Sequence, residues 1–412
     1  MHYRFLLALA ACCGTLAAAE PPRTWIDPDT GHRIVRLTDE PGSASLYFNQ
    51  NAYTPDGKEM VYTTPSGISV LDLATHKSRP VAEGPLRVIV AGHKTNSMFY
   101  VKNRNELYVT NVDTGATRKI ATLPAHNSIS VSTVNADETL LAGSYIENDG
   151  TDYNGGRRNG PQTLEQPLNK GQMMEQTLAA HLPRALFTVN SQTGELRVIH
   201  RSTDWLNHLE FSPTDPTLLM FCHEGPWHKV DRIWTIRTDG TQARLVHNRT
   251  MEMEIAGHEF WGHDGKTIWY DLQTPRGEDF WVAGYNVETG HRTWYHLQRN
   301  EWSIHFNVTP DEKLFCGDGG DPGQVAHAPD GEWIYLFRPE LTANRGSEGK
   351  DLIQPGVFHA EKLVNMSKHN YRLEPNVSFT PDQKWIVFRS NMFGPTYVFA
   401  VEVEKTSSIE SR

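Results

Sequence analysis

The apolar residues of this chain fall in short runs that are bounded by polar turn residues. Residues 60–62 (MVY), 267–270 (TIWY) and 385–388 (WIVF) are examples, and each follows a segment that contains Asp together with Gly, Pro or both. Short apolar runs that are rich in β-branched and aromatic residues and end at such turns predict β-strands. The pattern therefore indicates a protein built mainly from strands.

Five of these runs follow copies of one phrase, which begins with His, Asn or Gln and ends near Asp or Gly. The copies are QNAYTPDG from Gln50, HLEFSPTD from His208, HEFWGHDG from His258, HFNVTPDE from His305 and NVSFTPDQ from Asn376. A strand, a turn and a second strand, repeated at a spacing of tens of residues, are typical of a β-propeller blade. We expect the first residue of each phrase to face the central channel, which the innermost strands of a propeller line.

Further turns support this reading. Gly-containing turns at 113–115, 192–194, 238–240 and 288–290 each separate two β-rich runs, as hairpin turns do. Two blades with a degenerate phrase are expected at 88–101 and 129–145. The segment 24–38 is expected to pair with the last strand, 397–403, and so to close the ring without open sheet edges.

The sequence thus predicts an all-β protein, a single seven-bladed β-propeller over residues 20–412. Two stretches interrupt its rhythm. Residues 147–183 contain many Gly and Asn residues before a short predicted helix at 171–181, and residues 340–368 are polar and irregular except at 355–358. Both are interpreted as insertions, either at a substrate rim or as surface loops without contact to ligand.

The N-terminus resembles an export signal. Arg4 supplies a positive charge, residues 5–16 an apolar stretch, and Ala17 to Ala19 a small-residue cleavage site before Glu20. The alternative is a lipoprotein signal at Cys12, which leaves a shorter apolar stretch and is less favoured for that reason. Residues 1–19 are therefore read as a signal peptide, and the mature protein is expected to be periplasmic or secreted.

Composition narrows the classes of partner. The net charge of the 412 residues is −10 and basic runs are short, which argues against nucleic acid or an anionic membrane as the main partner. No stretch after the signal approaches the ~20 apolar residues of a membrane span. Cys222 and Cys316 are the cysteines of the mature chain; two buried thiols are favoured over a disulfide between them.

The polar first residues of the phrases define candidate chemistry. His258, His305, Glu374 and Asn376 together offer nitrogen and oxygen donors that suit Mn²⁺ or Ca²⁺, and a metal-free hydrogen-bond network is the alternative. Gln50 begins the first phrase and is a candidate substrate contact.

Two further histidines are candidates for catalysis. His208 begins its phrase, and His223 stands before Glu-Gly-Pro at an abrupt strand end. For each, a hydrogen bond within the fold is the structural alternative.

Four motifs carry a family resemblance. Residues 203–206 (TDWL), 221–226 (FCHEGP), 257–261 (GHEFW) and 317–319 (GDG) resemble those of the oligogalacturonate lyases, polysaccharide lyase family 22, over roughly residues 25–402. The resemblance implies a seven-bladed propeller that cleaves short uronides by β-elimination. It also implies a histidine base and a channel-bound Mn²⁺ that several His and a Gln hold.

The resemblance assigns roles to individual positions. His258 matches the family's metal-binding His, His208 matches a His that is expected to be the base, and His223 is the second candidate base. Arg184 roughly matches an Arg that assists the substrate. In the first insertion, Arg157 and Arg158 are expected either to grip a second sugar carboxylate or to lie in a solvated loop.

One segment departs from the family pattern. Where the family has Gln-x-x-His-x-His before Pro-Ser-Phe, this chain has Tyr371, Glu374 and Asn376 in place of the Gln and the two metal histidines. Tyr371 is kept as a substrate contact, and the expected ion is Mn²⁺ with Ca²⁺ as the alternative. The export signal is a second departure.

The sequence therefore predicts a lyase that acts on short pectic oligogalacturonides and gives 4,5-unsaturated uronate products. A lyase that acts on another acidic, uronic-acid oligosaccharide is the nearest alternative. Two readings without turnover also stay open: a non-catalytic periplasmic sugar-binding propeller and a protein-interaction propeller. The protein-interaction reading leaves the histidines at the channel unexplained.

Overall fold

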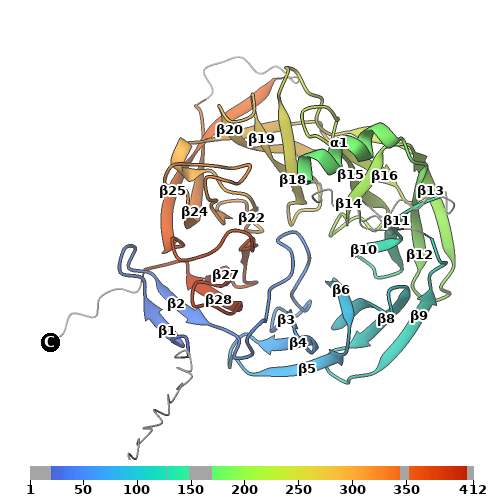
Figure 1. Cartoon of the computed structure of the whole chain (residues 1–412), viewed down its shortest axis with the longest axis horizontal. Coiled ribbons are helices and arrows are strands. Elements are labelled where there is room, and N and C mark those ends of the chain that lie inside the picture. The colour runs from blue at the N-terminus through green and yellow to red at the C-terminus, as the bar shows by residue number, and fades with distance from the viewer. Residues whose placement is uncertain (1–19, 127, 148–168, 344–351, 406–412) are drawn as a thin grey trace, which may run out of the picture.

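The structure is a computed structural model that describes residues 20–126, 128–147, 169–343 and 352–405. It is almost entirely β, with 47% strand and 4% helix, as the apolar pattern predicts. The strands form six sheets that stand in a ring around a common centre (Figure 1).

Three of the six sheets are four-stranded, and in each of them every strand pairs antiparallel with the next one along the chain. The first contains β6 (Leu86–Ala91), β7 (Ser97–Lys102), β8 (Glu106–Asn111) and β9 (Thr117–Thr122). The second contains β10 (Ser130–Val134), β11 (Leu140–Ile146), β12 (Arg184–Asn190) and β13 (Leu196–Ser202). The third contains β14 (Trp205–Phe211), β15 (Leu218–Glu224), β16 (Ile233–Arg237) and β17 (Arg244–Leu245).

An eight-stranded sheet follows, made of two antiparallel groups of four strands. The first group is β18 (Ile255–Trp261), β19 (Thr267–Gln273), β20 (Phe280–Asn286) and β21 (Arg292–Leu297). After the 3-10 turn η1 (Arg299–Glu301), the second group is β22 (Phe306–Val308), β23 (Phe315–Gly317), β24 (Trp333–Leu341) and β25 (Ile353–Asn365).

The two groups are joined by parallel pairing of β21 with β25, from Arg292–Ile353 to His296–Val357. The expectation that 340–368 is irregular except at 355–358 is therefore wrong for Ile353–Asn365, which form the 13-residue strand β25, while residues 344–351 lie outside the described residues. Pro355 and Gly356, near the start of β25, are uncommon in strands, so the pattern did not indicate one here. The β25 backbone pairs with β21 on one side and with β24 on the other.

The chain closes the ring by pairing its two ends. A five-stranded sheet has the order β1 (Thr24–Ile26), β2 (Arg33–Arg36), β28 (Tyr397–Glu402), β27 (Trp385–Ser390) and β26 (Ser378–Phe379). Ile34 of β2 lies opposite Val401 of β28, which confirms the predicted closure. Between this sheet and β6 stand β3 (Glu59–Thr64), β4 (Gly67–Asp72) and β5 (Ser78–Glu83).

One α-helix lies on the ring, α1 (Lys170–Ala180), where the sequence predicts a short helix. The Asn169 side chain accepts a hydrogen bond from the Gln172 main-chain N–H, and the Gln172 side chain accepts one from the Asn169 main-chain N–H. This capping box satisfies donors that would otherwise be unpaired. Among the described residues no helix has the length and apolar character to cross a membrane. Cys222 and Cys316 are buried free thiols, as predicted.

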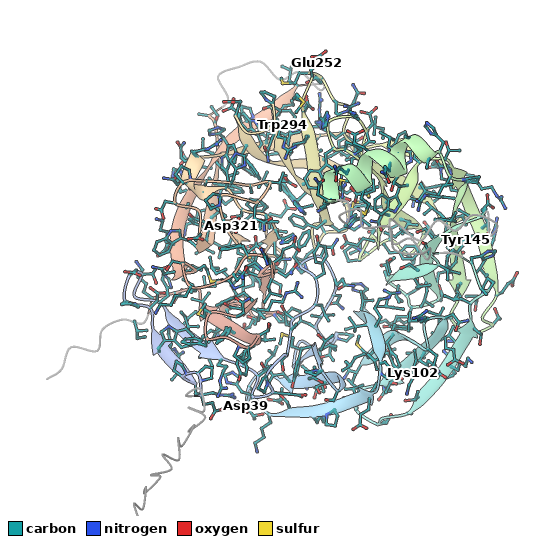
Figure 2. The ribbon with its side chains drawn as sticks, in the orientation of Figure 1. Asp39, Lys102, Tyr145, Glu252, Trp294 and Asp321 are labelled. Atoms are coloured by element: carbon teal, nitrogen blue, oxygen red, sulfur yellow. The ribbon has the colours of Figure 1, made fainter. Side chains whose placement is uncertain are left out.

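Side chains fill the spaces between neighbouring sheets (Figure 2), and many of the buried ones are aromatic. The largest cluster joins the eight-stranded sheet to the closing sheet and includes Phe280, Trp302, Phe337, Phe388 and Phe399, all at most 1% exposed. Flat rings with apolar faces fit between twisted sheets and remove large apolar areas from water. This packing explains the aromatic content of the apolar runs.

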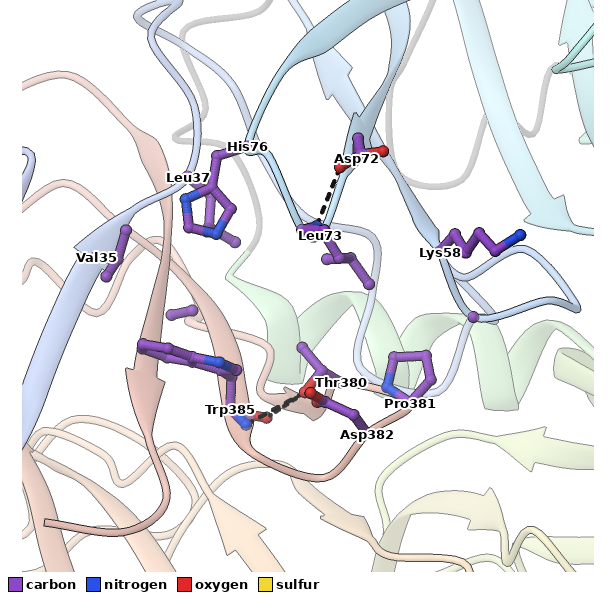
Figure 3. Close-up of a pocket in the computed structure, with 13 residues that line it drawn as sticks. Val35, Leu37, Lys58, Asp72, Leu73, His76, Thr380, Pro381, Asp382 and Trp385 are labelled. Carbon is purple, nitrogen blue, oxygen red and sulfur yellow. Dashed lines mark hydrogen bonds between the residues drawn. The ribbon is translucent and has the colours of Figure 1, made fainter.

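A cavity of about 280 Å³ lies between the closing sheet and the β3–β5 sheet (Figure 3). Leu73, Pro381 and Trp385 line it, with His76 at one side. None of the predicted catalytic or metal-binding residues reaches this cavity.

The Ile34→Ala substitution tests ring closure. Ile34 is fully buried on β2, so its truncation is expected to lower the free energy of unfolding by about 2–5 kcal/mol through lost burial and a residual cavity. Ile26→Ala in the preceding strand is the control, because Ile26 is 49% exposed and its truncation should change stability by less than about 0.5 kcal/mol. Urea denaturation measures both, and equal losses would contradict a special role for packing at the closure.

Candidate active site

Three of the five predicted channel residues lie on strained backbone near the inner edges of the sheets. His208 and His258 each have φ of 44°, and Asn376 has φ of 55°. At His208 and His258 this conformation coincides with a register shift, between Asn207 and Glu210 and between Gly257 and Phe260. Left-handed φ at a residue other than Gly costs on the order of 1–3 kcal/mol, and such bulges re-aim side chains next to functional sites.

A loop crosses the centre of the ring and faces these residues. This central loop (residues 47–51) connects the closing sheet to β3 and projects toward the middle of the ring in Figure 1. Asn376 holds it, because its amide oxygen accepts from the Phe48 main-chain N–H at 3.2 Å. Gln50 holds it from within, with its side chain bonded to the Tyr47 N–H and to the Ile89 carbonyl.

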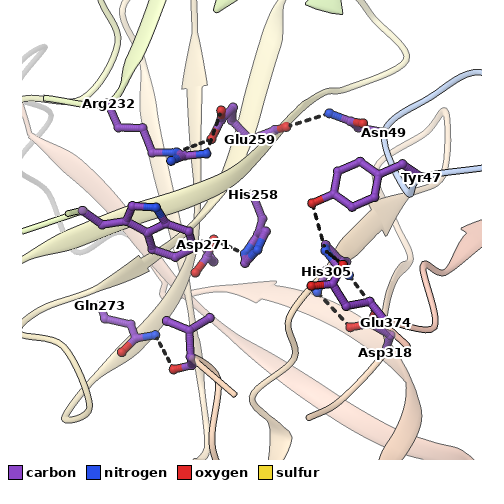
Figure 4. Close-up of polar contacts among 12 residues, drawn as sticks. Tyr47, Asn49, Arg232, His258, Glu259, Asp271, Gln273, His305, Asp318 and Glu374 are labelled. Atoms are coloured by element: carbon purple, nitrogen blue, oxygen red, sulfur yellow. Dashed lines mark hydrogen bonds and ion pairs between the residues drawn. The ribbon is translucent and has the colours of Figure 1, made fainter. Parts of the chain in front are cut away.

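The first histidine pair of the site is His258 with Asp271 (Figure 4). The His258 Nδ1 lies 3.0 Å from the Asp271 Oδ1, and Asp271 is 1% exposed on β19. No hydrogen bond among the described residues occupies the His258 Nε2. A carboxylate on one ring nitrogen fixes the orientation and tautomer of the ring, so Nε2 is left as the acceptor.

The second pair, His305 with Asp318, lies directly beside the first. The ring centroids of His258 and His305 are 4.8 Å apart. Asp318 binds the His305 Nδ1 at 2.8 Å and its main-chain N–H at 2.8 Å, so the ring is held at two points. The His305 Nε2 then faces the Tyr47 hydroxyl at 3.2 Å and the Glu374 Oε2 at 3.9 Å.

The third histidine, His208, belongs to a different charged group. Its Nε2 lies 3.1 Å from Glu224, which also binds Arg232 at 2.7 Å. Arg232 is 2% exposed at its side chain and binds Glu259 of β18 at 3.0 Å. Burial by itself raises the pKa of Glu224, but the Arg232 guanidinium and His208 outweigh it and hold that pKa well below its usual range.

His208, Cys222 and Glu224 are close enough together to be tested as a metal site. Burial raises the pKa of the Cys222 thiol well above its usual range, with Arg232 opposing that effect only in part. A thiol binds metal as the thiolate, and Arg232 already neutralises Glu224. This group is therefore unsuited to a cation.

The pair formed by His305 and Glu374 fits a cation better. An imidazole nitrogen and a carboxylate oxygen 3.9 Å apart are donors that manganese accepts, and Asp318 orients the imidazole from behind, as carboxylates commonly do for metal-binding histidines. The Glu374 side chain is 37% exposed, so it can turn toward an ion.

Several predicted site residues are occupied with the fold itself. The Asn376 amide binds the main chain of Phe48 and Glu374, and the Gln50 amide binds two main-chain groups. Tyr371 is 1% exposed and its hydroxyl donates to the Asp318 carbonyl. The structure therefore positions these three as supports of the site rather than as contacts to a ligand.

His223 and Arg184 lie apart from the paired histidines. The His223 Nδ1 faces Asp204 at 3.3 Å, and its ring stacks on Trp234. The neighbouring carboxylate of Glu224 contacts His208. Arg184 is 7% exposed and its guanidinium lies over the Trp205 ring. Arg157 and Arg158 lie outside the described residues.

The sequence pattern alone assigns no role to Asp271, Asp318 or Arg232. A weak signal is present, because each belongs to a repeat that begins with His: Asp271 lies within the second strand of its repeat, and Asp318 directly follows the second strand of the next. A second cavity, of about 330 Å³, is lined by Asn49, Glu210 and Trp261 and does not include the three histidines.

Two known proteins are similar to this chain over nearly its whole length. The chain is 26% identical over 396 residues to an oligogalacturonide lyase of Pectobacterium atrosepticum. The aligned region covers 92% of this chain and 95% of that protein. It is 25% identical over 391 residues to an oligogalacturonate lyase of Dickeya dadantii, with the same coverage.

Two solved structures extend the likeness to three dimensions. An oligogalacturonate lyase in complex with manganese superposes with a TM-score of 0.75 at 25% identity, over 93% of this chain and 96% of that one. The oligogalacturonate lyase of Vibrio parahaemolyticus has a TM-score of 0.73 at 25% identity, with the same coverage. A fungal β-propeller domain at 7% identity, with a TM-score of 0.51, shares the fold alone. The family model for oligogalacturonate lyase matches residues 21–407, and the chain therefore belongs to the oligogalacturonate lyase family.

Proposed function

We propose that this protein is a lyase that cleaves short galacturonide chains by metal-assisted β-elimination. The observation that carries the proposal is the juxtaposition of two histidine–aspartate pairs with Glu374, in a chain of the oligogalacturonate lyase family. The substrate class follows from that family, whose named members are lyases of oligogalacturonides.

The reaction sets two requirements on the site. A base takes the proton from C5 of the uronate, and the electron pair of the C5–H bond forms the C4=C5 double bond. The bond between C4 and its oxygen breaks, and that oxygen leaves and takes up a proton. Negative charge grows on the neighbouring carboxylate as the C5 proton departs. The site therefore needs a neutral imidazole at C5 and positive charge at that carboxylate.

We propose that His258, which the resemblance assigns to the metal, is the base. Asp271 occupies its Nδ1, so Nε2 accepts the proton, and its ring lies beside His305 and hence near the proposed cation. His208, the base that the resemblance implies, has its Nε2 bound to Glu224, and its ring lies near Tyr47 instead. We therefore assign the base to His258, and alanine variants separate it from His208, the alternative.

His305 and Glu374 would hold the divalent ion, Mn²⁺ in preference to Ca²⁺ because one ligand is an imidazole. A bound ion would supply the positive charge that the substrate carboxylate requires. Tyr47 lies against the same imidazole nitrogen, and burial raises the pKa of its hydroxyl well above the usual range.

The arrangement of the sheets supports a proposal for the number of blades. We propose seven blades: the three four-stranded sheets, the two halves of the eight-stranded sheet, the β3–β5 sheet and the closing sheet. The isolated bridge between Tyr53 and Met60 supports the count, because it supplies the β3–β5 sheet with an inner fourth strand.

Export is proposed from the sequence alone. The predicted signal, residues 1–19, lies outside the described residues, and a periplasmic or secreted location remains a prediction. A lyase outside the cytoplasm would meet pectic fragments before their uptake.

Turnover of digalacturonate and trigalacturonate is the first test. The C4=C5 double bond is conjugated with the carboxylate, so product formation is expected to raise the ultraviolet absorbance, and EDTA is expected to abolish the rise until Mn²⁺ is restored. No rise with Mn²⁺ or Ca²⁺ would contradict the galacturonide assignment. A rise on other uronic-acid oligosaccharides would then favour a lyase of different substrate, and binding without turnover would favour a sugar-binding propeller.

Alanine variants identify the base. His258→Ala is expected to lower kcat by about 10²–10⁴-fold, the usual contribution of a general base. His208→Ala should retain more activity, and His291→Ala is the control because its exposed side chain binds Gln354 of β25. A larger loss in His208→Ala than in His258→Ala would move the base to His208.

Metal binding can be measured without substrate. Glu374→Gln is expected to weaken Mn²⁺ binding at least about 10-fold in calorimetry, because it removes the charged ligand. Glu340→Gln is the matched control, since Glu340 is exposed on β24 and pairs with His359. Unchanged Mn²⁺ affinity in Glu374→Gln would place the ion elsewhere.

A further inference from the structure

One position in the repeated hairpins carries an aspartate in two of them and an arginine in the next. In the β18–β19 hairpin, Phe260 lies opposite Trp269, and two residues beyond Trp269 stands Asp271. In the β22–β23 hairpin, Asn307 lies opposite Cys316, and two residues further stands Asp318. These are the two carboxylates that hold the paired histidines.

The next hairpin has the same register with a cation in place of the aspartate. In the β26–β27 hairpin, Ser378 lies opposite Val387, and two residues beyond Val387 stands Arg389. The corresponding phrase begins with Asn376 instead of His. His–Asp, His–Asp and Asn–Arg therefore follow one another around the ring, and the third pair presents a positive charge where the first two present a negative one.

Among the described residues, the hydrogen-bond partners of the Arg389 guanidinium are main-chain carbonyls. Its Nε donates to the Glu374 carbonyl at 2.8 Å, and its Nη1 lies 3.5 Å from the Ser45 carbonyl. Within the described part of the chain, no side-chain carboxylate comes within ion-pair distance of it. Arg232, which also lies near the centre of the ring, is neutralised by two carboxylates.

The surroundings of Arg389 place it at the proposed reaction centre. Burial lowers the pKa of its guanidinium, and the charges of Glu374, Asp318 and Tyr47 oppose that effect. These three groups surround His305. Arg389 remains only partly exposed, so a ligand that reached it would meet a guanidinium largely shielded from water.

A largely buried guanidinium without a carboxylate partner is unfavourable, because water no longer compensates its charge. A planar carboxylate is the ligand that its fork of donors matches best. We propose that Arg389 is a substrate-binding residue that takes a carboxylate of the uronate chain. The proposal rests on the proposed function for the substrate class, and on the register and the contacts of Arg389 for the site.

Ligand binding without turnover tests this role. Galacturonate has no glycosidic bond to cleave, and its methyl ester replaces the charged carboxylate with a neutral group that is larger by one methyl. In NMR titrations, the wild-type protein is expected to prefer the acid over the ester. Arg389→Met is expected to reduce that preference by about 10- to 100-fold, the usual loss for a charge-assisted hydrogen bond. Arg389→Lys should fall between the two, because it keeps the charge and loses the fork.

A structural role would give a different result. If Arg389 only supported the Glu374 carbonyl, Arg389→Met would weaken acid and ester equally, and that outcome would overturn the proposal, as would an unchanged preference. Arg338→Met is the matched control, since Arg338 is exposed on β24 and pairs with Glu361. Failure of turnover in the wild type would contradict the lyase assignment and leave the acid-over-ester comparison valid, so the two failures are distinguishable.

Discussion

The pairing of β2 with β28 is the constraint on which the site depends. It brings the two ends of the chain into one sheet, and this sheet contributes Arg389 and stands next to Asn376. Asn376 holds the central loop, and that loop carries Tyr47 to His305. Contacts between residues that lie more than 250 positions apart therefore rest on a closure at the outer part of the ring. A chain with an open ring would have no means of setting these distances.

Charge compensation explains how so many ionisable groups remain buried near the centre. Arg232 spans two neighbouring sheets, because it binds Glu224 on its own sheet and Glu259 on the next one. Each carboxylate of the two histidine pairs is likewise held by a ring nitrogen. Ions in a medium of low polarity persist when their charges and hydrogen bonds are matched in this way. The same matching fixes side chains in one arrangement, which a site for an oriented sugar requires.

Local patterns in the sequence were sufficient for most strands and for the closure, because apolar runs and turn residues act over a few positions, but they did not indicate β25. The phrase also indicated His258 and His305 correctly as neighbours at the centre. It could not show that Asp271 and Asp318 hold them, since that partnership depends on cross-strand register and on a bulge whose φ the sequence does not reveal. The engagement of Gln50 and Asn376 with main-chain groups depends on the central loop, which no local pattern predicts.

The left-handed backbone at the first phrase position has a consequence for how such sites change. Among residues with a side chain, Asn tolerates positive φ better than most, and its amide can replace an imidazole as a hydrogen-bonding group. Asn376 has φ of 55° and keeps the local geometry of His208 and His258 without their chemistry. An exchange of His for Asn at this position is therefore inexpensive for the backbone. The ring can exchange an imidazole for an amide in one repeat, and so alter the ligands it offers, without redesign of the fold.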